Sequence, residues 1–191
     1  MMDKNELKEL IQYMQDFDNQ RELLIKKSRD VLKLSKQIIY CVHREDIDGA
    51  EKHAEGIKLR FKELVAIGKQ NAELTNVGAF KVAGQEYTEA LCYLAYVKGE
   101  ELPTYKTLGV NIPNYLSGLC DLTGEIVRKA INDVINGDKE SAIRAKKFTD
   151  ELYGDLLMFD FKNVMRKSFD RIKYDLRRLE DVVLSIKLKE E

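Results

Sequence analysis

Two pairs of carboxylates stand in segments of the chain that are otherwise almost free of charge. Glu86 and Glu89 lie three residues apart in GQEYTEA, and Asp121 and Glu125 lie four apart in YLSGLCDLTGEIV. In a helix either spacing puts both side chains on one face. Because burying an unpaired carboxylate costs several kcal/mol, we expect these acids to be protonated, to pair with distant bases or to bind a cation.

The chemistry of these acids favours a hard divalent cation. Carboxylates without histidine suit Mg²⁺ or Mn²⁺ better than zinc, and such an ion can activate water and neutralise charge that develops on a phosphate. The spacing alone is not specific, because Glu6 and Glu9 repeat it in a strongly charged segment. A second interpretation therefore stays open, in which the acids face a polar rim or form salt bridges with lysines.

Two basic rows accompany the acids. Residues 21–44 and 162–178 each hold seven Lys or Arg and two acids, whereas the net charge of the whole chain is only −1. At helical spacing each segment presents one basic face, formed by Lys26, Arg29, Lys33 and Lys36 in the first and by Lys167, Arg171, Tyr174 and Arg178 in the second. Such faces suit the backbone and bases of a single-stranded nucleic acid, although the solvated side of an ordinary amphipathic helix has the same pattern.

Helices must position these side chains, because no segment keeps the alternation of a strand. Residues 99–112 contain one of the two prolines and two glycines, with Pro113 directly after them, and predict a loop with a short turn. We expect one domain over residues 1–191, an all-α bundle of six to seven helices. The expected helices are 5–45, 47–76, 79–98, a helix from 111 or 114 to 136, 138–159 and 162–188.

Two patterns predict how the helices pack. Gly118 and Gly124 lower helix stability, so each is expected to allow a close approach of another backbone. The last helix has apolar residues at heptad spacing, which predicts lengthwise packing on another helix of the same chain or of a partner. These residues are Met165, Phe169, Ile172, Leu176, Leu179, Val183 and Ile186.

Several classes of protein are disfavoured. The N-terminus is charged from its third residue, and no apolar run is long enough to span a membrane, so we expect a cytoplasmic protein without membrane contact. Cys41, Cys92 and Cys120 have no metal or redox spacing and are expected to be reduced, buried thiols. His43 and His53 fit no catalytic triad and no Glu-x-x-His motif of a di-iron bundle, so we expect structural or surface roles.

Several motifs, in order, resemble the translin and translin-associated factor X family along nearly the whole chain. RELLIKKSRDVLKLSKQIIYCVHR (residues 21–44), GQEYTEA and YLSGLCDLTGEIVRKAIN (residues 115–132) are similar to the factor X branch, whereas RKSFDRIKYDLRRLEDVVLSIKLK (residues 166–189) is closer to translin proper. The mixture resembles a prokaryotic, archaeal-type member in which one chain serves as every subunit.

The resemblance implies a seven-helix bundle that assembles into a hollow homo-oligomer, an octamer in this family. It implies a Mg²⁺-dependent endoribonuclease that cleaves single-stranded RNA inside the shell, with Glu86, Glu89, Asp121 and Glu125 as its catalytic and metal-binding residues. The alternative is a translin-type oligomer that captures single-stranded RNA or DNA without cleaving it.

Overall fold

The computed structural model describes residues 2–189, which fold into helices and contain no strand. The long helices are α1 (Lys4–His43), α2 (Ile47–Gly68), α3 (Gly78–Lys98), α5 (Ile112–Ile135), α6 (Lys139–Leu156) and α7 (Asn163–Lys187). A single turn, α4 (Tyr105–Leu108), lies in the predicted loop, and a 3₁₀ turn, η1 (Ala72–Asn76), follows α2. The predicted all-α bundle of six to seven helices is confirmed.

Local signals set most helix ends, with one clear exception. At the start of α1, an Oδ1 of Asp3 accepts hydrogen bonds from the backbone nitrogens of Asn5 and Glu6 at 2.9 and 3.1 Å. The helix predicted over 47–76 instead ends at Gly68. The cause lies at Asn71, whose side chain accepts from the backbone nitrogen of Glu73 at 2.9 Å and so starts the separate turn η1.

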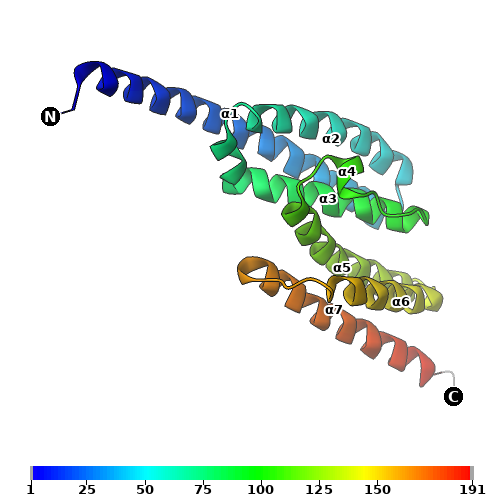
Figure 1. Cartoon of the computed structure of the whole chain (residues 1–191). Coiled ribbons are helices and arrows are strands. Elements are labelled where there is room, and N and C mark those ends of the chain that lie inside the picture. Colours follow the sequence, from blue (N-terminus) through cyan, green and yellow to red (C-terminus); the bar gives the residue numbers. More distant parts are fainter. Residues whose placement is uncertain (1, 190–191) are drawn as a thin grey trace.

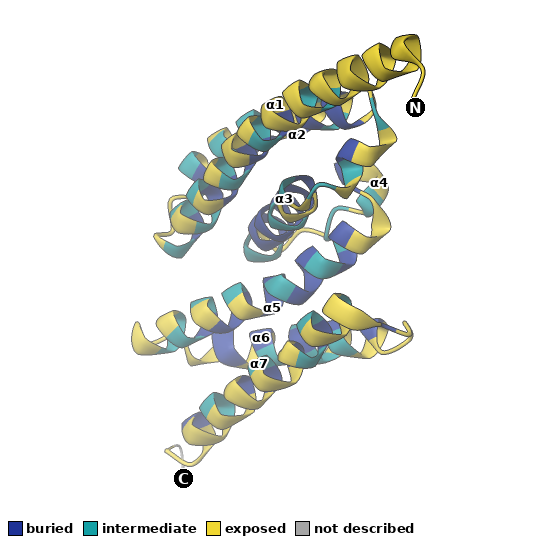
Figure 2. Cartoon of the chain, turned by 90° about the vertical axis from the view of Figure 1, so that its left-hand side faces the viewer, coloured by how far each residue is buried: buried dark blue, intermediate teal, exposed yellow. Residues whose placement is uncertain are grey.

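α3 and α5 lie in the middle of the bundle, with α1 and α2 on one side and α6 and α7 on the other (Figure 1). α1 packs on α2 and α3, α3 packs on α5, and α5 packs on α6 and α7. One cluster of buried apolar side chains runs through this arrangement from Leu24 in α1 to Ile186 in α7. α3 is buried on most of its sides (Figure 2), as its nearly uniform apolar sequence predicts.

The apolar heptad residues of α7 pack against other helices of the same chain. Five of its seven members are buried, and the other two, Met165 and Val183, are packed against the same core. Because the neighbours of α7 in the fold are α5 and α6, this seam needs no partner chain for its burial.

The two glycines of α5 have different surroundings. A β-carbon at Gly118 would lie 2.7 Å from the carbonyl oxygen of Gln85 and 2.6 Å from the β-carbon of Thr88, so this position permits the close crossing of α3 and α5. A β-carbon at Gly124 would meet nothing within 4 Å. The expectation of a close helix contact is therefore wrong for Gly124, which borders open space.

The first part of α1 extends beyond the rest of the bundle (Figure 1). Residues 2–16 are all exposed, and burial of this helix begins further along the chain (Figure 2). We call residues 4–16 the N-terminal arm. Near its base the hydroxyl of Tyr13 accepts a hydrogen bond from Nδ2 of Asn71 at 3.2 Å.

Two further sequence expectations can be compared with the structure. Cys92 and Cys120 are buried free thiols whose pKa is raised to about 12 by burial, whereas Cys41 is only partly buried. Among residues 2–189, no helix is both long and apolar enough to cross a membrane.

Candidate active site: a cavity lined by carboxylates

Three of the four predicted acids meet in one cavity. The cavity has a volume of about 360 Å³ and lies where α3, α5 and α7 come together. The glutamate pair comes from α3 and Asp121 from α5, so these two apolar helices bring acids to the same cavity. The lining residues are Glu86, Glu89, Cys120, Asp121, Gly124, Arg171 and Asp175.

Glu89 has the most perturbed environment of these acids. It is only 8% exposed, and burial raises the pKa of its carboxyl to about 9, with further contributions from Asp121, Glu86 and Glu125. Arg171 opposes this rise. A pKa in this range favours the protonated form of Glu89 at neutral pH, chiefly because the carboxyl is buried and also because other acids lie near it.

Glu86 lies nearer to solvent and close to a lysine of the first basic row. Burial raises the pKa of its carboxyl, and Asp121 and Glu125 raise it further, whereas Lys36 lowers it. The influence of Lys36 places the end of the basic row on α1 beside the cavity.

Asp121 is held from two sides. Nε2 of Gln85 donates a hydrogen bond to its Oδ2, and a terminal nitrogen of Arg171 donates to its Oδ1. Its side chain is 18% exposed. These contacts tie α5 to α3 and α7 at the cavity and orient the Asp121 carboxylate.

Glu125 does not line the cavity and forms a separate polar cluster. Its Oε2 contacts Nε2 of His43, and Arg128 lies 3.8 Å from the same oxygen. On the other side of the imidazole, Nδ1 of His43 lies 3.2 Å from the hydroxyl of Tyr93. The structure thus brings Glu86, Glu89 and Asp121 together and places Glu125 behind them, within electrostatic reach of Glu89.

The donor set of the cavity fits a hard divalent cation in its chemistry. As the side chains stand, no group of three His, Cys, Asp or Glu residues within 2–189 is arranged to hold a metal ion. The three carboxylates nevertheless share one cavity, where burial and neighbouring acids raise the pKa of Glu89 to about 9. Oxygen ligands with surplus negative charge are what Mg²⁺ and Mn²⁺ require.

The two basic rows lie on α1 and α7, and Arg171 of the second row lines the cavity. Lys26, Arg29, Lys33 and Lys36 are exposed on α1 and have no ion pair among the described residues. On α7, Lys167, Arg171, Tyr174 and Arg178 are also exposed, and Tyr174 is 70% exposed. Arg171 differs from the others because it is engaged by Asp121 and belongs to the cavity itself.

Three residues at or near the cavity were not predicted as site residues. Gln85 stands within GQEYTEA, directly before the first glutamate. Asp175 on α7 accepts a hydrogen bond from the hydroxyl of Thr123 at 2.7 Å, and its pKa is raised chiefly by burial. Asp175 follows Arg171 by four residues on the same helix face, a signal that could have identified it. His43 was expected to be structural or on the surface, and nothing in its spacing indicates the contact with Glu125.

Fold and cavity together define a class of protein: an all-α bundle with a carboxylate-lined cavity and two exposed basic helix faces. The chain belongs to the Translin family, whose family profile matches residues 19–190.

Relatives from several organisms resemble the chain to different extents. The chain is 28% identical to an uncharacterized protein of Methanocaldococcus jannaschii over 93% of this chain and 76% of that protein. It is 29% identical to a translin-associated protein X homolog of Schizosaccharomyces pombe over 68% of this chain and 61% of the relative. Identity to translin of Gallus gallus is 32% over 50% of this chain, but the match spans only 42% of that protein.

Solved structures show the same fold. The crystal structure of apo-NeC3PO has a TM-score of 0.88 and 31% identity, and the match covers 96% of this chain and 98% of that one. The structure of an AfC3PO complex with duplex RNA has a TM-score of 0.82 and 24% identity, covering 96% and 97%.

Proposed function

We propose that this protein is a Mg²⁺-dependent endoribonuclease that cleaves single-stranded RNA. The observation that carries the proposal is the meeting of Glu86, Glu89 and Asp121 in one cavity that Arg171 of the α7 basic face also lines. The family of the chain supports it, because the motifs that supply these acids resemble the factor X branch.

The three acids of the cavity would hold the metal ion. When bound, Mg²⁺ or Mn²⁺ supplies an activated water and neutralises charge on the phosphate. Gln85 and Arg171 orient the carboxylate of Asp121. Because metal ligands must be deprotonated, metal binding would release the proton that Glu89 holds at neutral pH. Glu125, held by His43, adds negative charge from behind the cavity.

The basic faces would hold the RNA. Lys36 on α1 and Arg178 on α7 lie near cavity acids, since each affects the pKa of one of them. A phosphodiester that spans the two rows would therefore pass the carboxylates. Tyr174, exposed between the bases of α7, offers a face on which an unpaired base can stack, which favours single strands over duplexes.

The working form would be a homo-oligomer, an octamer by analogy with the family, whose cavities face an enclosed space. The mixture of factor X and translin motifs in one chain supports identical subunits.

A non-catalytic RNA-binding oligomer is the second candidate, and one observation favours it. Asp121 is already paired with Arg171 and accepts a hydrogen bond from Gln85, and within residues 2–189 no three acids stand in position to share an ion. Such a protein would keep the basic faces and would not need the acids.

Incubation of end-labelled single-stranded RNA with Mg²⁺ or with EDTA distinguishes the two candidates. The nuclease shortens the RNA only with Mg²⁺, and an Asp121→Asn variant purified in the same way does not. RNA that is bound but never shortened with either Mg²⁺ or Mn²⁺ would make the protein a binding module.

A further inference from the structure

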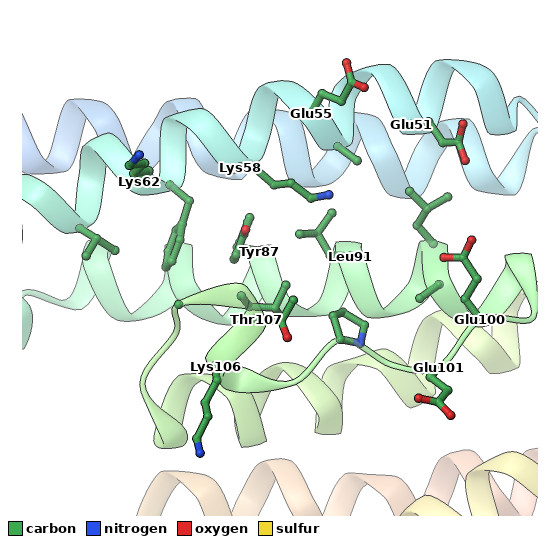
Figure 3. Close-up of a pocket in the computed structure, with 18 of the residues that line it drawn as sticks. Glu51, Glu55, Lys58, Lys62, Tyr87, Leu91, Glu100, Glu101, Lys106 and Thr107 are labelled. Carbon is green, nitrogen blue, oxygen red and sulfur yellow. The ribbon is translucent and has the colours of Figure 1, made fainter.

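A second and larger cavity lies on another side of the bundle. It is a groove of about 760 Å³ between α2, α3 and residues 99–109 (Figure 3). Its floor is apolar and includes the rings of Phe61 and Tyr87, which stack with centroids 4.1 Å apart, together with Leu91 and Leu94. We call this the α2–α3 groove.

The charges along the α2–α3 groove are unevenly compensated. Lys58 and Lys62 stand toward one end and Glu51 and Glu100 toward the other (Figure 3). At the acidic end Lys98 pairs with Glu51 at 2.7 Å and with Glu100 at 2.6 Å. By contrast, the ammonium groups of Lys58, Lys62, Lys69 and Lys106 have no ion pair within residues 2–189. Two further carboxylates, Glu55 and Glu101, line the groove, so lysines outnumber glutamates there by five to four.

The N-terminal arm has the complementary character. Its exposed apolar residues Leu7, Leu10, Ile11 and Met14 follow the spacing i, i+3, i+4, i+7 and form one strip. This is the anchor pattern of a helix that docks into an apolar groove. At 100° per residue, Asp18, two residues past the arm, lies on the side of the strip, whereas Glu6 and Glu9 lie on other faces. Asp3, directly before the arm, also lies on this side, where its Oδ1 caps the helix.

The arm cannot fill the groove of its own chain. α1 is one helix from Lys4 to His43, and no glycine or proline interrupts residues 3–48. The arm therefore continues the direction of α1 away from the bundle (Figure 1). Folding it back onto α2 and α3 would require breaking the helix.

We infer that the N-terminal arm of one copy docks in the α2–α3 groove of a second copy. The apolar strip lies on the floor around Phe61, Tyr87 and Leu91, and the carboxylates beside the strip meet the unpaired lysines. The dimensions agree, because α2 from Glu51 to Lys69 measures about 27 Å and the arm about 18 Å at the rise of an α-helix. This inference rests on the proposed self-assembly of the chain and supplies a contact for it.

Disulfide cross-linking tests the contact directly. In a Cys41→Ser background, Leu10→Cys and Lys62→Cys proteins are mixed under dissociating conditions, reassembled and oxidised. We expect a two-chain product in the mixture and little in either protein alone. Gln12→Cys, on the opposite face of the arm, is the matched control and should cross-link to Lys62→Cys at a much lower yield.

Sedimentation over a dilution series tests the energetics of the same contact. Leu10→Gln combined with Ile11→Gln should weaken subunit association on the order of 100-fold, because two apolar side chains lose their burial. Ala66→Arg places a long side chain in the groove from an exposed position and should weaken association at least about tenfold. Gln12→Ala should leave association unchanged, and circular dichroism should show all variants folded.

Two results would overturn the inference. One is efficient cross-linking of Leu10→Cys to itself with no effect of Ala66→Arg, since the arms would then pair with each other. The other is unchanged assembly of both the arm and the groove variants. RNA cleavage measured on the same samples separates this inference from the proposed function, because cleavage without the mixed cross-link contradicts only the docking, and the cross-link without cleavage contradicts only the nuclease.

Discussion

The same Glu-x-x-Glu spacing occurs in two regions with opposite surroundings. Glu6 and Glu9 lie in the N-terminal arm, where every residue from 2 to 16 is exposed. Glu86 and Glu89 lie in α3, the most buried helix of the bundle, and line a cavity with Asp121. Both pairs point to one side of a helix, yet only the second is surrounded by apolar side chains and by further acids.

The difference shows that spacing sets the direction of the carboxylates and packing sets their chemistry. Water surrounds the first pair, which lies on an exposed helix with no apolar side chains packed over it. In the cavity, burial and the neighbouring acids raise the pKa of Glu89 to about 9. A group in this state is poised to exchange its proton for a cation, which the arm glutamates are not.

The largest expected effect is on catalysis. Glu86→Gln combined with Glu89→Gln should lower Mg²⁺-dependent RNA cleavage by about three orders of magnitude, because two of the three proposed metal ligands could no longer ionise. Initial rates on a labelled single strand measure this. Asp181→Asn, at an exposed acid of α7, is the control and should cleave at the wild-type rate; a double variant that cleaved as fast would remove the pair from the site.

The next effect is on stability. Since the pKa of Glu89 is raised to about 9 from an ordinary value of 4.5, the native state binds more protons than the unfolded state between these values. The metal-free protein should therefore lose stability as pH rises from about 5 to 9. Glu89→Gln should remove most of this slope and stabilise the protein by about 2 kcal/mol at pH 8, with little change at pH 5.

Urea unfolding at the two pH values, in EDTA, measures the stability effect. In the arm, Glu6→Gln combined with Glu9→Gln should change stability by less than about 0.5 kcal/mol at both pH values. If Glu89→Gln and the arm double variant changed the free energy of unfolding equally at both pH values, the contrast between the two regions would be contradicted.

The smallest expected effect is on RNA affinity. Lys36 stands where the basic row of α1 reaches Glu86, so Lys36→Ala should weaken RNA binding by about three- to tenfold and reduce the salt slope by about 0.7. Fluorescence anisotropy over a range of salt concentrations measures both. Lys52→Ala on α2 should bind RNA as the wild type does, and an equal loss in the two variants would point to nonspecific attraction.

Much of the fold could be predicted from the sequence because its signals are local. Capping residues such as Asp3 and Asn111 fix helix starts, and the apolar character of residues 79–98 indicates a buried helix. The end of α2 at Gly68 was missed, because the side chain of Asn71 closes its own turn inside a segment that keeps a helical pattern.

The acids of the site could be identified from the sequence, whereas the residues that contact them mostly could not. The apolar surroundings of the two acid pairs marked them as site candidates, but whether Glu89 and Asp121 would meet in space stayed open in the sequence. The contact of Arg171 with Asp121 joins residues 50 positions apart and depends on how α7 packs against α5. The separation of Glu125 from the cavity depends in the same way on His43 at the end of α1. No residue pattern along the chain predicts these contacts.

Mn²⁺ binding tests the central claim most directly, because it asks whether packing makes a metal site of one glutamate pair and not of the other. Titration calorimetry or electron paramagnetic resonance would compare the wild type with the two double Gln variants described above. We predict that the arm variant binds Mn²⁺ like the wild type, and that Glu86→Gln with Glu89→Gln weakens binding at least about tenfold. Undiminished Mn²⁺ binding by the cavity variant would contradict the account.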